Sequence, residues 1–142
     1  MAITSTLCTS FKKELLQGVH NFNKASSPDT FKLALYSSTA SLDASTTAFT
    51  TSGEVTGTNY TSGGATLTLK TGTPTTDGTT AVVDFDPLTF SNVTLTAAGA
   101  LIYNSSDSNK AVCVISFGKD VSASASDFTI TFPSTGASNS II

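Results

Sequence analysis

The stretch 98–118 constrains the fold most, because two short apolar runs flank a polar segment within it. The apolar runs are 100–103 and 111–117, and the polar segment is 104–110. Short β-rich runs around a segment of this length predict a β-hairpin whose loop is longer than a two-residue turn.

The run 111–117 has the character of a strand interior. Val112, Val114 and Ile115 are β-branched, and their restricted χ1 angle suits a pleated strand. The run is also almost continuously apolar, which predicts a strand that is covered on both faces or that faces another subunit. We therefore expect the central hairpin of an all-β domain here.

Length and charge restrict the class of protein. The chain has 142 residues, a formal net charge of -3 and a pI of about 4.7, and this length predicts one domain. There is no Arg, and the seven Lys are scattered, whereas nucleic-acid binding needs a concentrated basic patch. No stretch approaches the roughly 18 apolar residues of a membrane span, and residues 1–7 lack the pattern of a signal peptide. We expect synthesis in a reducing cytoplasm, with neither a nucleic-acid nor a membrane partner.

Hydroxyl residues dominate the polar part of the chain. Ser and Thr make up about a third of the residues, whereas 12% are charged. Such a composition fits either disorder or a β protein whose exposed strand positions are Thr. The 39% hydrophobic content with nine Phe favours the β protein. A surface poor in charge loses little desolvation free energy on burial, which suits a protein that sits in an assembly.

The N-terminal part predicts an extended arm and then a helix. Residues 1–9 are small and polar, with Ile3 and Leu7 as isolated apolar anchors. The segment 10–22 predicts one short helix with Ser10 as its N-cap. Its apolar residues recur every three or four positions, at Phe11, Leu15, Val19 and Phe22.

The rest of the chain predicts seven or eight short strands in a single antiparallel β-sandwich or jelly-roll-like domain over 10–142. The clearest strands are 30–37, 65–70, 81–85, 88–95, 100–103, 111–117 and 127–132. We expect a loop at 119–127. The segment 38–64 is expected to be a folded excursion whose apolar residues pack onto a sheet edge or a neighbouring chain.

Residues that could carry chemistry have simpler structural explanations. Asp84 and Asp86 would share one face of a strand and could help to ligate a hard cation, or they could end that strand. His20 is the one histidine, and no nucleophile or orienting partner can be assigned to it. Cys8 and Cys113 fit no metal spacing, and either a disulfide or two free thiols is open. We predict no enzyme, no cofactor and no metal site.

Three tyrosines offer a carbohydrate-binding alternative. Tyr36, Tyr60 and Tyr103 could form a platform on which sugar rings stack, although the chain has no Trp. Few charged or amide groups cluster near them in the sequence.

Seven segments, in order along nearly the whole chain, resemble a family of small virion structural proteins from tailed bacteriophages. They are 29–36, 53–57, 90–94, 97–104, 110–112, 117–120 and 128–133, and Tyr60 and the glycine pair 63–64 fit the same pattern. The stretch AAGALIYN at 97–104 is the most family-like. Ala98 departs from the family, which often has Arg at this position, so the contact that such a charge would make is missing here.

The resemblance is strongest to capsid decoration (cement) proteins of cyanophage-like viruses. It implies a protein made in the host bacterial cytoplasm that binds the outer surface of the virion head where major capsid subunits meet, often as a trimer, and stabilises the shell. Ile3, Leu7, Phe49 and Tyr60 are our candidates for contacts with the major capsid protein or a neighbouring subunit, and ordinary packing within the chain is the alternative. The alternative function is a tail- or fibre-associated module that binds the host or a carbohydrate.

Overall fold

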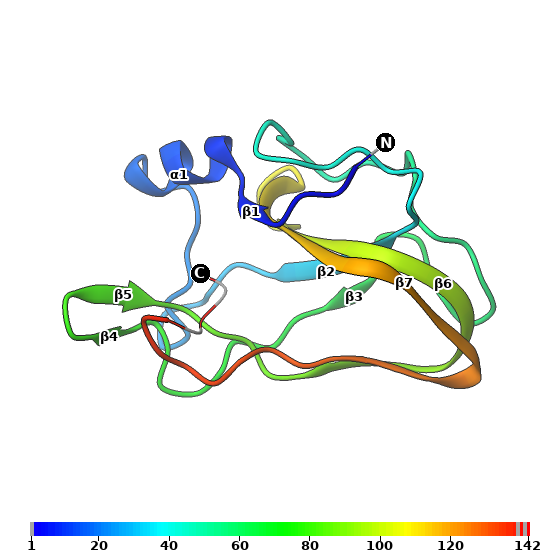
Figure 1. The fold of residues 1–142 in the computed structure, drawn as a ribbon. Coiled ribbons are helices and arrows are strands. Elements are labelled where there is room, and N and C mark those ends of the chain that lie inside the picture. The colour runs from blue at the N-terminus through cyan, green and yellow to red at the C-terminus, as the bar shows by residue number, and fades with distance from the viewer. Residues whose placement is uncertain (1, 139, 141) are drawn as a thin grey trace.

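The computed structural model describes residues 2–138, 140 and 142, and it shows a mainly antiparallel β fold with one short helix (Figure 1). The predicted class is therefore confirmed at this level. Within these residues, one sheet has the order β1-β7-β6-β2-β3, and β4 pairs with β5 in a separate hairpin. The elements are β1 (Thr6–Leu7), α1 (Thr9–Leu16), β2 (Phe31–Tyr36), β3 (Ala65–Thr66), β4 (Thr75–Asp77), β5 (Thr80–Val82), β6 (Leu88–Asn104) and β7 (Lys110–Ile130).

Strands β6 and β7 form one long hairpin, of 17 and 21 residues. The hairpin predicted from the sequence is its closed end, where Asn104 pairs with Lys110. The strands predicted at 88–95 and 100–103 are parts of one strand, β6. The loop predicted at 119–127 is wrong, because these residues belong to β7.

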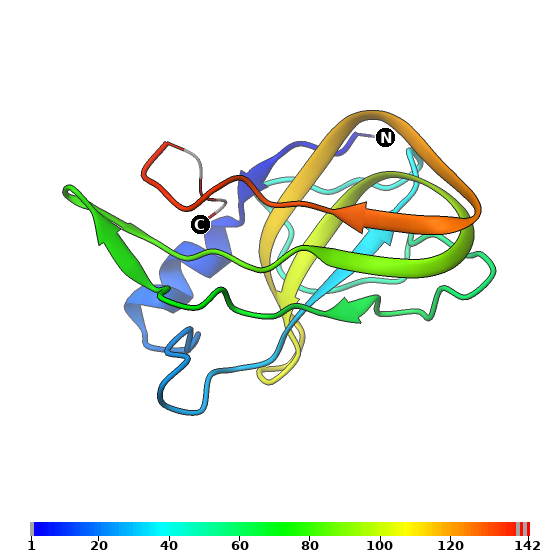
Figure 2. The ribbon, with the colours of Figure 1, turned by 90° about the horizontal axis from the view of Figure 1, so that it is seen from below.

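Irregular pairing bends this hairpin. The register between β6 and β7 shifts at four places, and such bulges bend and twist a strand pair. The hairpin folds back, so that the start of β6 and the end of β7 form a second layer beneath the rest of the sheet (Figures 1 and 2). Hydroxyl pairs join the strands of this second layer, with Thr96 and Ser122 at 2.8 Å and Thr89 and Thr129 at 3.0 Å. Ser122, one of the serines that suggested a loop, therefore serves as a cross-strand partner.

The segment 65–70 connects the two layers. Its first part pairs with β2, and the Leu67 N–H donates to the Phe31 carbonyl at 2.8 Å. Its last part pairs with the residues that precede β6, where Leu69 lies opposite Phe85. The backbone ladder thus continues from one layer into the other on this side of the molecule.

Strand β2 is buried on both faces at the centre of the core. Leu33 and Leu35 are buried, as their alternation predicts, but Ala34 and Tyr36 on the opposite face are buried as well. The loop after β2 covers this second face, where the Tyr36 hydroxyl donates to the Thr50 carbonyl at 2.6 Å.

Aromatic rings run through the core from the N-terminal part to the C-terminal part. Phe22 stacks on Phe31, with ring centroids 4.3 Å apart and planes 5° apart. Phe31 lies 6.2 Å from Phe85, which lies 5.8 Å from Phe132. These four rings join the segment after α1, β2 and the two ends of the second layer.

Helix α1 ends at Leu16, so the predicted C-terminal end of the helix at residue 22 is wrong. Gly18 adopts a φ of 72° and stops the helix. The Gly18 N–H donates to the Leu15 carbonyl at 3.1 Å, and the Val19 N–H donates to the Glu14 carbonyl at 3.0 Å. This is the Schellman arrangement, in which a glycine in the left-handed region satisfies the last carbonyls of a helix.

The apolar stripe predicted for this helix is only partly used. Phe11 is buried, and Phe22 is buried but lies beyond the helix. Leu15 is 42% exposed and Leu16 is 92% exposed. The N-cap is Cys8 rather than the predicted serine, and its side chain makes no capping hydrogen bond.

Residues 2–9 take the extended path predicted for the arm until α1 begins, but they are held by their own chain; Met1 lies outside the described residues. Leu7 in β1 lies opposite Cys113 in β7, and Ile3 forms a parallel bridge with Leu42. The open edge of β7 supplies N–H and C=O groups that need partners. This segment therefore forms part of the sheet edge rather than a free arm.

The segment 38–64 is folded, and its apolar residues pack onto the chain's own sheet. Leu42 and Val55 are buried in the core. An isolated bridge joins Thr58 to Thr94 in β6. The segment 38–64 thus packs over the sheet of its own chain.

We predict that Phe31→Ala lowers the free energy of unfolding by about 3–5 kcal/mol, because it removes a buried ring and leaves a cavity. Urea unfolding followed by circular dichroism measures this value. The control is Leu16→Ala, since Leu16 is 92% exposed and we expect a change within about 0.5 kcal/mol. Equal losses from the two substitutions would contradict the assigned core.

Candidate interaction surface

A large bulge in β7 reshapes one corner of the hairpin. Ser116 lies opposite Gly99, and Val121 lies opposite Ala97, so residues 117–120 of β7 face Ala98 alone. Bulges redirect side chains and are common beside functional sites. Here the bulge comes before the bend that takes β7 into the second layer (Figure 1).

The bulge itself has a defined local geometry. Gly118 has a φ of 75°, a conformation that glycine adopts without steric cost. Its N–H donates to the Ser116 hydroxyl oxygen at 3.2 Å. Lys119 and Asp120, which follow, are exposed. The corner therefore presents one cation and one anion side by side.

The N-terminal segment packs against this corner through a close contact at Gly99. A Cβ atom on Gly99 would lie 2.6 Å from the Ile115 carbonyl oxygen and 2.8 Å from Ile3 Cγ2. The Thr4 N–H donates to the Leu42 carbonyl at 2.9 Å and the Leu42 N–H donates to the Ala2 carbonyl at 3.0 Å, which holds the backbone on both sides of Ile3. A glycine at position 99 thus allows Ile3 to lie directly on β6.

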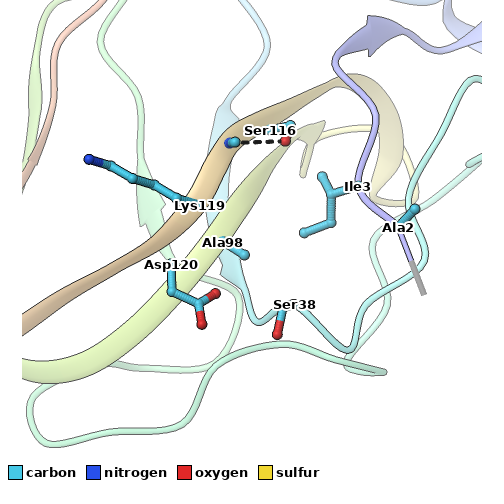
Figure 3. Close-up of a pocket in the computed structure, with 8 residues that line it drawn as sticks. Ala2, Ile3, Ser38, Ala98, Ser116, Lys119 and Asp120 are labelled. Carbon is cyan, nitrogen blue, oxygen red and sulfur yellow. Dashed lines mark hydrogen bonds between the residues drawn. The ribbon is translucent and has the colours of Figure 1, made fainter.

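A groove of about 320 Å³ lies between the bulge and the N-terminal segment. We call it the N-terminal groove; its lining residues are Ala2, Ile3, Ser38, Ala98, Ser116, Gly118, Lys119 and Asp120. Ile3, Ala98, Asp120 and Ser38 surround it, while the side chain of Lys119 points away (Figure 3). Small side chains, one apolar side chain and a charged rim suit contact with a surface of another polypeptide.

The four predicted contact residues each pack against the core while they remain partly exposed. Ile3 covers Gly99, and Leu7 lies beside β7. Phe49 stacks on Tyr103, with ring centroids 4.8 Å apart. Ile3 lines the N-terminal groove, whereas Phe49 and Tyr60 lie outside it.

Tyr60 belongs to a network that fixes the loop after β2. Its hydroxyl accepts the Leu35 N–H at 2.9 Å and donates to Glu54 Oε1 at 2.9 Å. The Ser62 hydroxyl and the Gly63 N–H also donate to the Glu54 carboxylate, each at 2.7 Å. Burial raises the pKa of Tyr60 well above its ordinary range, the Leu35 N–H opposes this and the Glu54 charge adds to it. The phenol therefore stays neutral as a structural link.

The other two tyrosines do not form an exposed platform with Tyr60. Tyr36 and Tyr103 are buried, and the Tyr103 hydroxyl donates to the Gly63 carbonyl at 2.6 Å. Sugar stacking on these three rings, which the sequence left open, would require them to leave the core.

His20 lies in a buried polar network that ties α1 to the closed end of the β6–β7 hairpin. Its Nε2 lies 2.7 Å from Glu14 Oε2, and its Nδ1 lies 3.0 Å from Asn104 Nδ2. Asn104 also donates to Asp29 at 2.7 Å and accepts the Ser106 N–H at 3.0 Å. The histidine is thus a structural connector. No sequence pattern indicates that these residues meet.

Asp84 is a structural anchor rather than an open ligand. It is 1% exposed and accepts hydrogen bonds from the Phe85 N–H and the Thr135 hydroxyl, both at 2.9 Å. The Lys70 ammonium lies 3.8 Å away. Among the described residues, no group of three or more His, Cys, Asp or Glu side chains gathers as metal ligands.

Both cysteines are free, buried thiols. Burial raises the pKa of Cys8 to about 11, with smaller contributions from the charges of Asp43 and Glu14. Burial also raises the pKa of Cys113 to about 12. Because the thiolate is the reactive form, both side chains are inert in the folded chain.

The sequence does not predict the bulge, because 117–127 resembles the end of a strand followed by a polar loop. Gly118, directly after a β-branched run, is the signal that could have marked it. Comparison with known proteins finds no matching family, no matching curated protein and no matching solved structure. In the described part of the chain, no helix has both the length and the apolar character required to cross a membrane.

We predict that Gly99→Ala displaces Ile3 and lowers the free energy of unfolding by about 1–3 kcal/mol, because its methyl group overpacks this contact. Amide hydrogen exchange of residues 2–7 should become faster in the variant. Ala98→Ser, at a half-buried neighbour on the same strand, is the control and should leave this exchange unchanged. Unaltered exchange in Gly99→Ala would disprove the close contact.

We predict that Cys8 and Cys113 resist alkylation at pH 8, where both raised pKa values keep the thiols protonated. Their contribution to stability is present below pH 9.0, the ordinary value, and is lost as pH rises through about 11 and 12. Mass spectrometry after iodoacetamide treatment measures the labelling. Addition of urea should make both thiols reactive, and rapid labelling without urea would contradict their burial.

Proposed function

We propose that this chain is a bacteriophage capsid decoration protein, which binds the outer surface of the head where major capsid subunits meet. The observation that carries the proposal is the N-terminal groove, in which the most family-like stretch, 97–104, meets the N-terminal segment and the bulge 117–120. Two of the segments that resemble the phage family thus contribute to one exposed corner. The sandwich-like fold that the strand pattern predicts is supported by the way in which the β6–β7 hairpin folds back into a second layer.

The surface composition supports attachment to an assembled lattice. With 12% charged residues, the chain exposes mainly hydroxyl and small side chains. Burial of such a surface costs less desolvation free energy than burial of a highly charged one. Lys119 and Asp120 at the groove rim would give the contact its orientation, because complementary charges mainly determine specificity.

Binding of the shell would stabilise it by linkage. A protein that binds the assembled lattice better than free subunits shifts the equilibrium toward the lattice. If one molecule touches several capsid subunits, weak individual contacts add through effective concentration. The N-terminal segment, the groove rim and the loop 38–64 would supply these contacts.

The test is co-sedimentation of the full chain with expanded, undecorated capsids of its virus. We expect saturable binding at a fixed ratio to capsid subunits and a raised melting temperature of the capsid. The charge-reversed variant Lys119→Glu/Asp120→Lys should bind roughly tenfold more weakly. Lys12→Glu, an exposed position on α1 outside the groove, is the control and should bind like the wild type.

The possible outcomes test the decoration role and the N-terminal groove separately. Binding that neither variant alters would remove the N-terminal groove from the proposal but leave the decoration role. No binding of the wild type would reject the decoration role. Attachment to tails or host polysaccharide would then be measured.

A further inference from the structure

The outer edge of β7 is open beyond the bulge. Strand β1 covers β7 at Cys113 and Val114, and the Ser5 hydroxyl oxygen accepts the Ser116 N–H at 2.8 Å. From residue 121 to residue 130, β6 is the one strand of the described chain that pairs with β7. In an antiparallel ladder, about half of the N–H and C=O groups face away from the paired strand. This part of β7 runs round the bend of the hairpin, and its last residues form the margin of the second layer (Figure 2).

Such an edge is a template for pairing with another chain unless it is protected. Lysine, proline and β-bulges on the edge are common protections. The segment 121–130 contains neither lysine nor proline, and a bulge in β7 lies near its midpoint. Asp127 is its one charged residue, and its Oδ1 accepts the Asn92 N–H at 3.0 Å. The edge is thus long and nearly neutral.

The side chains of 121–130 show the same order of burial classes whether the segment is followed from residue 121 or from residue 130. Val121 and Ile130 at the ends are half-buried, and Ala123 and Phe128 are buried. The remaining six residues are exposed, and they lie symmetrically about the midpoint between 125 and 126.

A second bulge produces this symmetry. Leu95 pairs with Ala123 and Val93 pairs with Ser126, so that two residues of β7 face Thr94. The extra residue changes the alternation, and Ala123 and Phe128 both point into the core although five positions separate them. Without it, a regular strand would place them on opposite faces.

We propose that this edge pairs with the same edge of a second copy of the chain, antiparallel about a twofold axis. Each residue then lies opposite one of its own exposure class, with Val121 opposite Ile130 and Ser124 opposite Asp127 of the second copy. A twofold contact requires a surface that complements itself, and the symmetric pattern of 121–130 meets this condition. The pairing joins two short ladders on either side of the bulge.

The proposed register also brings no two like charges opposite each other. The two Asp127 carboxylates do not face each other, and each lies opposite a Ser124 hydroxyl that can donate to its Oδ2. Val121 and Ile130 form β-branched pairs at both ends, a combination that stabilises neighbouring strands. The arrangement rests on the edge alone and is independent of the proposed function. It predicts a dimer, whereas the resemblance to decoration proteins implies a trimer.

Sedimentation equilibrium of the purified full chain over a concentration series tests the proposal. We expect a monomer–dimer equilibrium. Ser124→Asp places one new carboxylate opposite each of the two Asp127 side chains and should weaken the dimer roughly tenfold or more. Ser124→Lys places a cation there and should keep the dimer, with an affinity that falls as salt is added. Ser41→Asp adds the same charge at an exposed serine outside the edge and is the matched control, which should stay within about threefold of the wild type.

Circular dichroism verifies that each variant is folded, as expected for exposed positions. A monomeric wild type, a trimer, or a dimer that Ser124→Asp and Ser41→Asp weaken equally would overturn the proposed pairing. None of these outcomes depends on capsid binding, so the two proposals can fail separately.

Discussion

The ladder between β6 and β7 is the interaction on which the rest of the structure depends. A regular hairpin of this length would be a flat ribbon with two exposed faces, which is marginally stable in water. The bulges convert this ribbon into two layers that bury each other's apolar side chains. Strand β2 and the segment 65–70 can then add to the sheet and continue it from one layer into the other.

Buried polar groups attach the remaining segments to this frame. Asn104, at the closed end of the hairpin, connects to His20 and Asp29, which lie between α1 and β2. Glu54 does the same for the loop after β2, with three donors on one carboxylate. Such networks stabilise a fold when every member is paired, and they are costly when one partner is lost. They give loops of ordinary polar sequence a single conformation.

Local signals explain which parts of the fold the sequence predicts. The alternation in 30–37 and 65–70 and the apolar run 111–117 indicate strands because side-chain burial there follows the strand period. The end of α1 was misplaced because the apolar spacing continues to Phe22, although Gly18 breaks the backbone first. The strand at 119–127 was missed because Ser and Ala pack there against partners on β6, which local sequence does not show.

The candidate surfaces were harder to predict for the same reason. Ile3 was identified as an anchor, but its contact depends on the missing side chain of Gly99 in the middle of β6. The N-terminal groove and the open edge both arise from bulges, and a bulge is a property of the pairing between two strands. A single strand's composition contains little of that information.

The pairing of β1 also bears on how the chain can fold while it is being synthesised. Leu7 pairs with Cys113, 106 residues later, and β2 pairs with β6. Strand β1 cannot pair with β7, and β2 cannot pair with β6, until most of the polypeptide has left the ribosome, since these contacts are distant in sequence. Within the nascent N-terminal half β2 can pair with β3, but the edges that later meet β6 and β7 must stay exposed without aggregating. Its many Ser and Thr residues, and its small number of long apolar runs, keep these exposed strands soluble until their partners are synthesised.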